Sequence, residues 1–536
     1  MGEIERVTTT LVKELHSENG TASKPSSFLS RLDIEKLAPW LLAVFICYGL
    51  FRNFFESAHR FFWYDEVCTW VMVRQPNLST MWRALAHGVD GQPPGYYVIE
   101  RVATHLSGNE QISFRIPSIL AFSFTIVCLF LFIKRRSGAV NALLFASIPL
   151  FSILFDTYAM EARPYALVMA CISFALICYQ HVPNVRWTIL LGVSLALAQA
   201  LHYFAVIIFV PFFAAEAVFY LKTRRLRLGV WIALACGFLP LACFGTLLFR
   251  FKALYSAHYW SLPSLKAAEA CYSWFFNTTF TLGAILAAGA VLAILGRMLV
   301  DERRKAMPDS PSTDLVHEQT LALGLVLVPF LAFLMAKLAH GGFTSRYALS
   351  GVLGFSLVAT YVFPAIKSRA LGTFSILLLL LAFTFHEHRF WTFHKFDFNS
   401  PAVSAENLVL AAGHPDLPFV VSDSMEYSPL IYYASPEWRK RFVMLVDPPE
   451  AVKYVGNDSN DIEMKAMRDY GPFQVYDFQP FAAQHPTFVL YSSFGGFGGD
   501  WWVPRLYRDG YKFQLLVKKD YWNSVYLVTR PDVAKR

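Results

Sequence analysis

Two adjacent acids, Asp65 and Glu66, stand between bulky aromatic residues in the segment 61–67, about ten residues after the apolar run 38–55. A carboxylate so close to a lipid interface is partly desolvated and can act as a base. Aromatic side chains are typical of membrane interfaces, and they also stack on sugar rings. The alternative is that the two acids only solvate or cap an interfacial helix. The pair is our first candidate for catalysis.

A second charged pair, Glu161 and Arg163, directly precedes Pro164 and a later apolar run. Proline suits the first turn of a helix, so both side chains should lie just outside that helix, at the membrane surface. The acid can help to bind a substrate or a metal, and the guanidinium can hold a phosphate. A local ion pair at the interface is the alternative.

Three further candidates lie beside later apolar runs: His202, His340 and Arg346. Arg346 would lie on the face of the membrane that is usually depleted of basic residues, which makes it a candidate for binding an anion. Snorkelling towards the interface is the other explanation for it. For His202, a histidine that is satisfied within the interface is the more economical interpretation.

The elements that hold these residues are apolar. Of the 536 residues, 55% are hydrophobic and 16% are charged, whereas soluble proteins carry about 25% charged residues. This composition excludes a disordered chain, a fibrous repeat and an ordinary multidomain cytosolic protein. Apolar runs of roughly 17–25 residues can cross a bilayer as helices. We therefore predict a polytopic α-helical membrane protein with about eleven transmembrane helices, near 38–55, 116–133, 138–155, 165–180, 187–203, 204–221, 229–249, 276–296, 321–339, 347–365 and 371–386.

Lysine and arginine collect in short loops after every second predicted helix, at 134–136, 222–227, 297–305 and 367–369. The positive-inside rule places these loops in the cytoplasm. The formal net charge of +8 therefore reflects membrane topology and not nucleic-acid binding. The loops with the candidate residues then lie together on the outer face.

The chain is expected to contain three regions. A cytoplasmic segment covers 1–37, and a transmembrane domain covers 38–386 with a catalytic first outer loop at 56–115. Charged residues become more frequent in 387–536, which predicts a soluble extracytoplasmic domain. That domain should have an α/β fold, with strands at 419–422, 442–446, 487–491 and 525–528 and a helix over 425–441.

Several other motifs are weak. The eight cysteines include no C-x-x-C pair, which excludes a thiolate metal cluster, and the glycine-rich segment 494–500 lacks the lysine and spacing of a phosphate-binding loop. Acids, arginines and a histidine from several loops on one face, beside a bilayer, suit an enzyme whose substrate has an anionic head and a lipid tail. A transporter would place its ionisable groups in the middle of its spans.

The motifs resemble those of the GT-C superfamily of integral-membrane glycosyltransferases. The nearest group is family-39-like and includes protein mannosyltransferases, lipid A aminoarabinose transferase and lipopolysaccharide galacturonosyltransferases. The sequence departs from the family at Gln92, where a histidine is usual. The matching segments span most of residues 38–365 and lie at 63–66, 92–97, 114–118, 161–165, 202–203 and 346–347.

The resemblance implies transfer of a hexose or pentose from a polyprenyl-phosphate donor, with inversion, at the outer face of the plasma (inner) membrane. The acceptor would be a hydroxyl of a cell-envelope glycolipid, polysaccharide or protein. The expected catalytic residues are Asp65, as general base, and Glu66. The expected substrate-binding residues are Asp90, Gln92, Tyr96, Arg115, Glu161, Arg163, His202, His340 and Arg346.

Two questions stay open in the sequence. GT-C enzymes differ in their use of a divalent cation; if this chain uses one, Glu66, Asp90 or Glu161 would hold it, with Asp90 and Glu161 as the first candidates. The alternative function is a lipid-linked polysaccharide flippase or polymerase, or another membrane transport protein, with no base in the first outer loop. The expected partners are the lipid-linked sugar, the acceptor and the bilayer, without nucleic acid.

Overall fold

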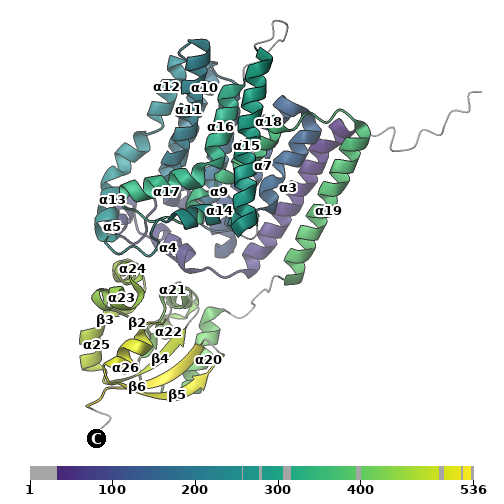
Figure 1. Ribbon diagram of the computed structural model, residues 1–536. Coiled ribbons are helices and arrows are strands. Elements are labelled where there is room, and N and C mark those ends of the chain that lie inside the picture. Colours follow the sequence, from purple (N-terminus) through teal and green to yellow (C-terminus); the bar gives the residue numbers. More distant parts are fainter. Residues whose placement is uncertain are drawn as a thin grey trace, which may run out of the picture.

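A computed structural model describes residues 33–255, 257–276, 280–305, 315–393, 400–493, 500–520 and 523–532. A large helical body is followed by a smaller domain built on a β-sheet (Figure 1). Most of the predicted cytoplasmic segment 1–37, namely residues 1–32, and the glycine-rich residues 494–499 lie outside the described residues.

The body consists mainly of helices that run along one common direction, with shorter helices at the end nearest the C-terminal domain (Figure 1). Its longer members pack around one continuous apolar core. The helices of the body, apart from the three of the first outer loop, are α3 (Ile34–His59), α7 (Glu110–Ala146), α8 (Ile153–Ala159), α9 (Tyr165–Gln180), α10 (Val185–Leu201), α11 (Phe209–Thr223), α12 (Leu228–Cys236), α13 (Leu239–Tyr255), α14 (Leu265–Phe276), α15 (Phe280–Lys305), α16 (Val316–Val326), α17 (Val328–Ala339), α18 (Gly351–Val362) and α19 (Arg369–Phe393).

The membrane-spanning helices are fewer and less regular than predicted. Within the described part of the chain, five segments are long and apolar enough to cross a bilayer, and the pair α16–α17, bent by 61°, makes a sixth if it counts as one span. The prediction of a polytopic membrane fold is confirmed, but the predicted number of eleven spans is not. Helices α9 and α10 have only 16 and 17 residues. At 1.5 Å per residue they reach about 24–26 Å, which is short of a ~30 Å hydrocarbon core.

Some predicted boundaries also differ. The predicted spans 116–133 and 138–155 are joined in α7, which bends at Gly138, where φ is +86°. A positive φ is readily adopted by glycine, so the kink forms without the steric cost that another residue would carry. An apolar pattern alone does not reveal such a bend.

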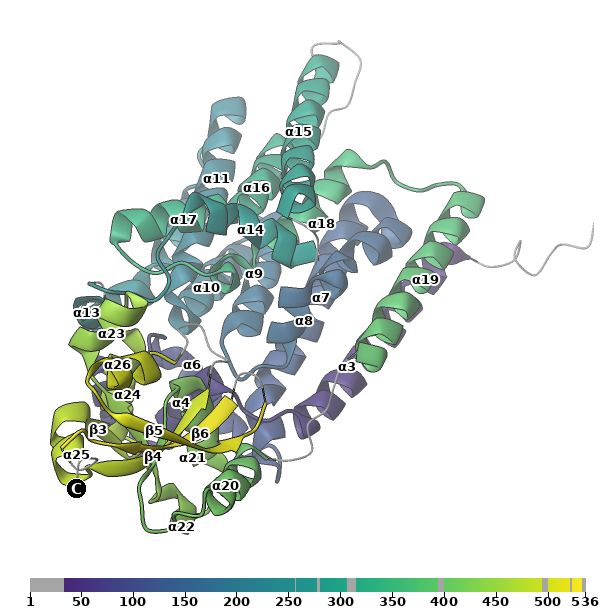
Figure 2. The ribbon, with the colours of Figure 1, turned by 60° about the horizontal axis from the view of Figure 1, so that its bottom comes forward.

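The first outer loop is itself helical. Within the predicted loop 56–115 lie α4 (Tyr64–Val73), α5 (Leu78–Ala86) and α6 (Pro94–Ala103), placed between the longer helices and the C-terminal domain (Figure 2). Pro94 occupies the first turn of α6, where its missing N–H costs no hydrogen bond. A Cβ on Gly95 would lie 2.6 Å from the carbonyl oxygen of Ala200, so glycine permits α6 to approach α10 this closely.

The C-terminal domain contains a six-stranded sheet in the order β3-β2-β1-β4-β6-β5. Strands β1 to β4 are parallel, and β6 and β5 join antiparallel at one edge. The strands are β1 (Phe419–Val421), β2 (Phe442–Val446), β3 (Val475–Asp477), β4 (Thr487–Ser493), β5 (Lys512–Lys518) and β6 (Asn523–Thr529). The four predicted strands coincide with β1, β2, β4 and β6, whereas β3 and β5 were not predicted.

Helices cover both faces of this sheet. On one face lie α20 (Pro401–Ala412), α21 (Ser424–Tyr433) and α24 (Ser459–Arg468), and on the other α23 (Pro448–Val455), α25 (Phe478–Gln484) and α26 (Trp502–Arg508). The helix predicted over 425–441 is divided into α21 and α22 (Pro436–Arg439), because a proline follows the first segment.

The C-terminal domain packs directly on the first outer loop. Val67 and Met72 of α4 share one apolar cluster with Leu430 and Ile431 of α21. The hydroxyl of Tyr433 accepts a hydrogen bond from the backbone N–H of Phe62 at 2.8 Å. Residues far apart in the sequence therefore line a common space between the body and the domain.

Candidate active site

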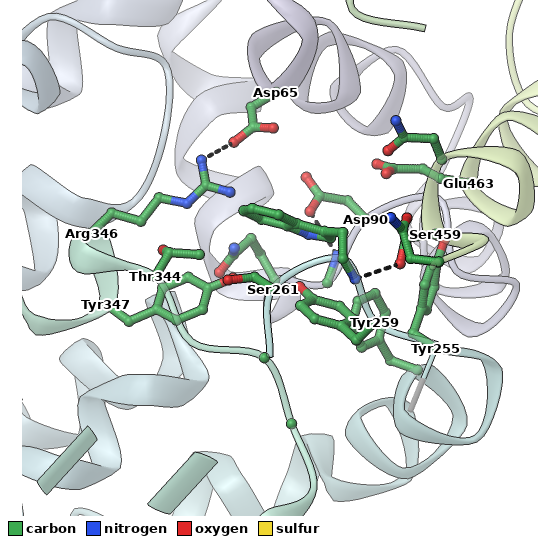
Figure 3. Close-up of a pocket in the computed structure, with 18 of the residues that line it drawn as sticks. Asp65, Asp90, Tyr255, Tyr259, Ser261, Thr344, Arg346, Tyr347, Ser459 and Glu463 are labelled. Atoms are coloured by element: carbon green, nitrogen blue, oxygen red, sulfur yellow. Dashed lines mark hydrogen bonds and ion pairs between the residues drawn. The ribbon is translucent and has the colours of Figure 1, made fainter. Parts of the chain in front are cut away.

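A cavity of about 780 Å³ opens between the first outer loop, the loops before α14 and α18, and the C-terminal domain. Polar and aromatic side chains from each of these segments face it (Figure 3). Among the predicted site residues, those that line the cavity are Asp65, Asp90, Gln92, Arg163, His202, His340 and Arg346. Glu66, Tyr96, Arg115 and Glu161 are not part of its lining.

Asp65 lies in the first turn of α4 and faces two arginines. Nη1 of Arg346 donates a hydrogen bond to Oδ2 of Asp65 at 2.7 Å, and Nε of Arg163 lies 3.8 Å from the same oxygen. The Asp65 side chain keeps 13% of its surface exposed. The carboxylate is thus charge-compensated yet reachable from the cavity.

The second ion pair of the site joins Arg163 to Asp90. Nη1 of Arg163 donates to Oδ2 of Asp90 at 2.7 Å and to the backbone carbonyl of Asp65 at 3.1 Å. Asp90 also accepts a hydrogen bond from the N–H of Gly91 at 2.6 Å. The carboxylate of Asp90 therefore holds Arg163 against the α4 backbone, close to Asp65. Two guanidinium groups converge on one small region, which suits a dianionic or phosphate ligand.

Glu66 and Arg115 do not have the roles predicted for them. Both side chains are fully buried and form a bidentate pair, with Nη2–Oε2 and Nε–Oε1 distances of 2.7 Å. Arg115 also donates to the carbonyls of Ser57 and Arg60. Burial opposes the charged form of Glu66, but the Arg115 guanidinium holds the pKa of this carboxyl below its usual range. Neither side chain has surface left for a substrate, so the pair positions the turn before α4.

Glu161 and Tyr96 are likewise buried away from the cavity. Glu161 pairs with Arg60 at 2.9 Å and is 3% exposed. Burial raises the pKa of Glu161 to about 7, although Arg60 opposes that shift. Tyr96 has no exposed surface. Substrate-binding roles for Glu161 and Tyr96 are therefore not supported.

The proposed metal pair also has other partners. Asp90 is bound to Arg163, and Glu161 to Arg60, so each carboxylate is already matched by a guanidinium. In the described ranges, no group of three or more His, Cys, Asp or Glu side chains that could hold a metal ion is found. Among the described lining residues, Arg163, Arg346 and Lys252 are cationic side chains.

Two predicted residues line the cavity with neutral side chains. Nδ1 of His202 accepts a hydrogen bond from the N–H of Phe204 at 3.1 Å. Burial and the nearby arginines Arg163 and Arg346 lower the pKa of His202 to about 3, so the imidazole is neutral at pH 7. Gln92 is 7% exposed and also faces the cavity.

Sequence reasoning missed several lining residues. Tyr255, Tyr259 and Trp260 come from the end of α13 and the loop after it, and Glu463 comes from α24 of the C-terminal domain. The guanidinium of Arg346 lies 5.8 Å from the centre of the Trp260 ring. The Tyr259 and Trp260 aromatics were visible in the sequence, in the loop 250–275 on the predicted outer face. Glu463 carried no local signal, because an acid on a polar helix is ordinary.

Comparison with known proteins supports one part of the chain directly. Residues 91–249 match the family described as dolichyl-phosphate-mannose-protein mannosyltransferase. This confirms the resemblance to GT-C glycosyltransferases. The matched segment contains the end of the first outer loop, Arg163 and His202. No curated protein matches the chain.

Three solved structures are similar to this chain at low sequence identity. ArnT from Cupriavidus metallidurans in the apo state shares 12% identity, with a TM-score of 0.43 over 90% of this chain and 97% of that one. ArnT bound to undecaprenyl phosphate shares 14%, with a TM-score of 0.39 over 91% and 97%. An Archaeoglobus fulgidus oligosaccharyltransferase, in complex with Zn and sulfate, shares 10%, with a TM-score of 0.41 over 75% and 59%.

Proposed function

We propose that this membrane glycosyltransferase moves a hexose or pentose from a polyprenyl phosphate to a hydroxyl of a cell-envelope glycolipid, polysaccharide or protein. The observation that carries the proposal is Asp65, held in a cavity beside two arginines. A base next to two phosphate-binding groups is what displacement of a sugar phosphate requires.

The positions of the basic clusters in the fold support an outer-face location for the active site. The loop between α11 and α12, the end of α15 and the connection from α18 to α19 lie at the end of the body opposite the C-terminal domain (Figure 1). Those segments carry the basic clusters at 222–227, 297–305 and 367–369. The positive-inside rule then favours an outer-face active site and an extracytoplasmic C-terminal domain in the plasma membrane.

The chemistry is a direct displacement. The acceptor oxygen attacks the anomeric carbon, the bond from that carbon to the phosphate oxygen breaks, and the polyprenyl phosphate leaves with the electron pair. Asp65 takes the hydroxyl proton of the acceptor. One displacement inverts the anomeric centre and needs no second carboxylate as nucleophile, which agrees with Glu66 being buried.

The arginines have two partners in this scheme. Without donor, Arg346 binds Asp65 and Arg163 binds Asp90. A donor phosphate would compete with these carboxylates for the guanidinium groups, because arginine pairs with phosphate as well as with carboxylate, often through two hydrogen bonds. As Arg346 turns to the phosphate, Asp65 is released to accept a proton. Donor binding and activation of the base are thereby linked.

The test is a panel of polyprenyl-phosphate sugars offered to membranes that contain the chain, with sugar transfer measured. We expect Asp65→Asn to lower transfer by ~10²–10⁴-fold, because a general base is lost. Asp416→Asn, at an exposed position of the C-terminal domain, is the matched control and should leave transfer unchanged. Full transfer in Asp65→Asn would refute the assignment. Movement of a lipid-linked polysaccharide that persists in Asp65→Asn would instead favour the flippase or polymerase.

A further inference from the structure

The cavity has two walls of different charge. Every basic residue that lines it among the described residues belongs to the membrane body, namely Arg163, His202, Lys252, His340 and Arg346. The described lining residues of the C-terminal domain include no Lys, Arg or His. They do include four acids, Asp423, Asp458, Asp461 and Glu463. The wall from the C-terminal domain is therefore neutral to acidic.

Three of these acids have structural partners. Asp423 accepts a hydrogen bond from the N–H of Met425 at 2.9 Å and caps α21. Asp461 accepts one from the N–H of Asp447 at 2.6 Å, and Asp458 lies 3.6 Å from Nδ1 of His258. The first two interactions maintain the local fold of the domain, and the third joins the start of α24 to the loop before α14.

Glu463 has a different environment. Its Oε1 contacts the thiol of Cys68 at 3.2 Å, and a thiol is a weak hydrogen-bond donor. The close-up places its carboxyl across the cavity from Arg346 (Figure 3), and the contact with Cys68 places it beside α4, the helix of Asp65. Burial raises the pKa of Glu463 to about 8, and the carboxylates of Asp90 and Asp65 act in the same direction. At pH 7 the group is a neutral carboxylic acid that can both donate and accept a hydrogen bond.

The helix that carries Glu463 is fixed relative to the arginines. Oγ of Ser459, in the first turn of α24, accepts a hydrogen bond from the N–H of Trp260 at 3.1 Å. The neighbouring Ser261 accepts a backbone hydrogen bond from Phe343 at 3.0 Å, in the loop that leads to Arg346. One short segment thus connects the donor side of the cavity to α24.

We propose that α24 forms the acceptor side of this site, that Glu463 binds the acceptor hydroxyl, and that the site prefers an acceptor without a phosphate at its reacting end. This inference rests on the proposed sugar transfer. The donor phosphate occupies Arg163 and Arg346, which leaves an acceptor to face Glu463, Asp90 and Asp65. A second phosphate there would meet the carboxylates of Asp65 and Asp90 and, among the described lining residues, no further guanidinium group, and like charges disfavour binding.

Binding of the acceptor by Glu463 does not change which group takes the proton. Asp65 takes the proton of the attacking hydroxyl, and Glu463 keeps its own proton while it holds the acceptor in line with the anomeric carbon. Glu463 is therefore a positioning and specificity-determining residue. Its contribution should be seen in the use of acceptor and not in the affinity for donor.

The experiment uses the full chain in nanodiscs with the polyprenyl-phosphate sugar found in the donor panel. Two acceptor probes are compared, octyl β-D-glucoside and its 6-phosphate, by kcat/KM. We expect the wild-type chain to prefer the neutral probe by about tenfold or more. Glu463→Lys should lower that preference by about tenfold, with the donor KM changed less than twofold. Glu463→Gln should keep the preference at pH 7, because a neutral amide replaces a neutral acid.

The matched control is Glu437→Lys, at an exposed position of the same domain, which should change neither the preference nor the donor KM. The inference would be overturned if the wild-type chain used both probes equally, preferred the phosphate or used neither probe. An unchanged ratio in Glu463→Lys would also overturn it. If Glu463→Lys fails to fold, loss of the preference in Glu463→Gln at pH 7 would overturn it. A wild-type chain that consumes no donor would refute the proposed function itself.

Discussion

The two walls of the cavity hold carboxyl groups in opposite states. On the membrane-body wall, Asp65 and Asp90 are each paired with an arginine at 2.7 Å. On the wall of the C-terminal domain, Glu463 contacts a thiol, and burial raises its pKa to about 8. The same chemical group is therefore paired with a guanidinium on one side of the substrate and protonated at pH 7 on the other. The comparison indicates that the body holds the charged donor and the domain holds the uncharged acceptor.

The largest effect is expected on stability, in the fully buried pair Glu66–Arg115 behind the membrane-body wall, which we call the charged wall. Arg115→Ala leaves Glu66 buried without its cation, which costs about 3–5 kcal/mol of stability. We expect little folded protein in thermal unfolding and size-exclusion measurements. The double variant Glu66→Leu with Arg115→Met should recover most of the folded protein, because neither change leaves a buried charge. If Arg115→Ala folds normally and only the donor KM rises, Arg115 binds the substrate, as the sequence predicted.

The next effect tests the charged wall itself. Arg346→Lys keeps the charge but loses the planar, bidentate group, and a charge-assisted hydrogen bond contributes about 1.5–3 kcal/mol. We expect kcat/KM for the donor to fall by about ten- to a hundredfold, measured with the polyprenyl-phosphate sugar. Arg186→Lys, at an exposed position, serves as the control. If Arg346→Lys keeps full activity, the arginine does not bind the phosphate through two bonds.

A pH profile tests the neutral wall. Below pH 8 Glu463 is protonated, and above it the carboxyl becomes a third negative charge near Asp65 and Asp90. Acceptor use should therefore fall as pH rises through about 8, by up to about tenfold per pH unit, while the donor KM stays constant. The groups that face Glu463 are Asp65, Tyr64 and Cys68 of α4, Asp90 after α5, Tyr255 of α13 and Tyr259. Glu463→Gln should remove this fall in acceptor use above pH 8. If the fall persists in that variant, another of these groups causes it.

The smallest effect concerns the connection between the walls. Ser459→Ala removes the acceptor of the Trp260 N–H and should cost about 0.5–1.5 kcal/mol. We expect faster amide hydrogen exchange at Trp260 and an acceptor KM raised by about two- to tenfold. Ser435→Ala removes a comparable hydroxyl, which caps α22 away from the cavity, and should leave the acceptor KM unchanged. Unchanged exchange at Trp260 would show that the loop is held by other contacts.

The sequence by itself determined the class of the molecule and named Asp65, Asp90, Arg163 and Arg346 as candidates for the site. Apolar runs with basic clusters on one side require a polytopic membrane body, since charge is costly in hydrocarbon and Lys/Arg bias sets orientation. Asp65 and Arg163 were found because acids and arginines beside the ends of apolar runs are unusual. The structure brings both to one cavity, together with Arg346.

Only the tertiary structure decided which of two neighbouring acids faces the cavity. Asp65 and Glu66 are adjacent in the sequence, but successive residues of a helix point about 100° apart, so one faces Arg346 and the other is buried against Arg115. Glu463 lies almost 400 positions from Asp65 and enters the site because α21 and α24 pack on the first outer loop. Apolar patterns and motif spacing report only on residues that are close in the sequence. The partner that a carboxylate meets, and hence its charge, is fixed by packing between distant segments.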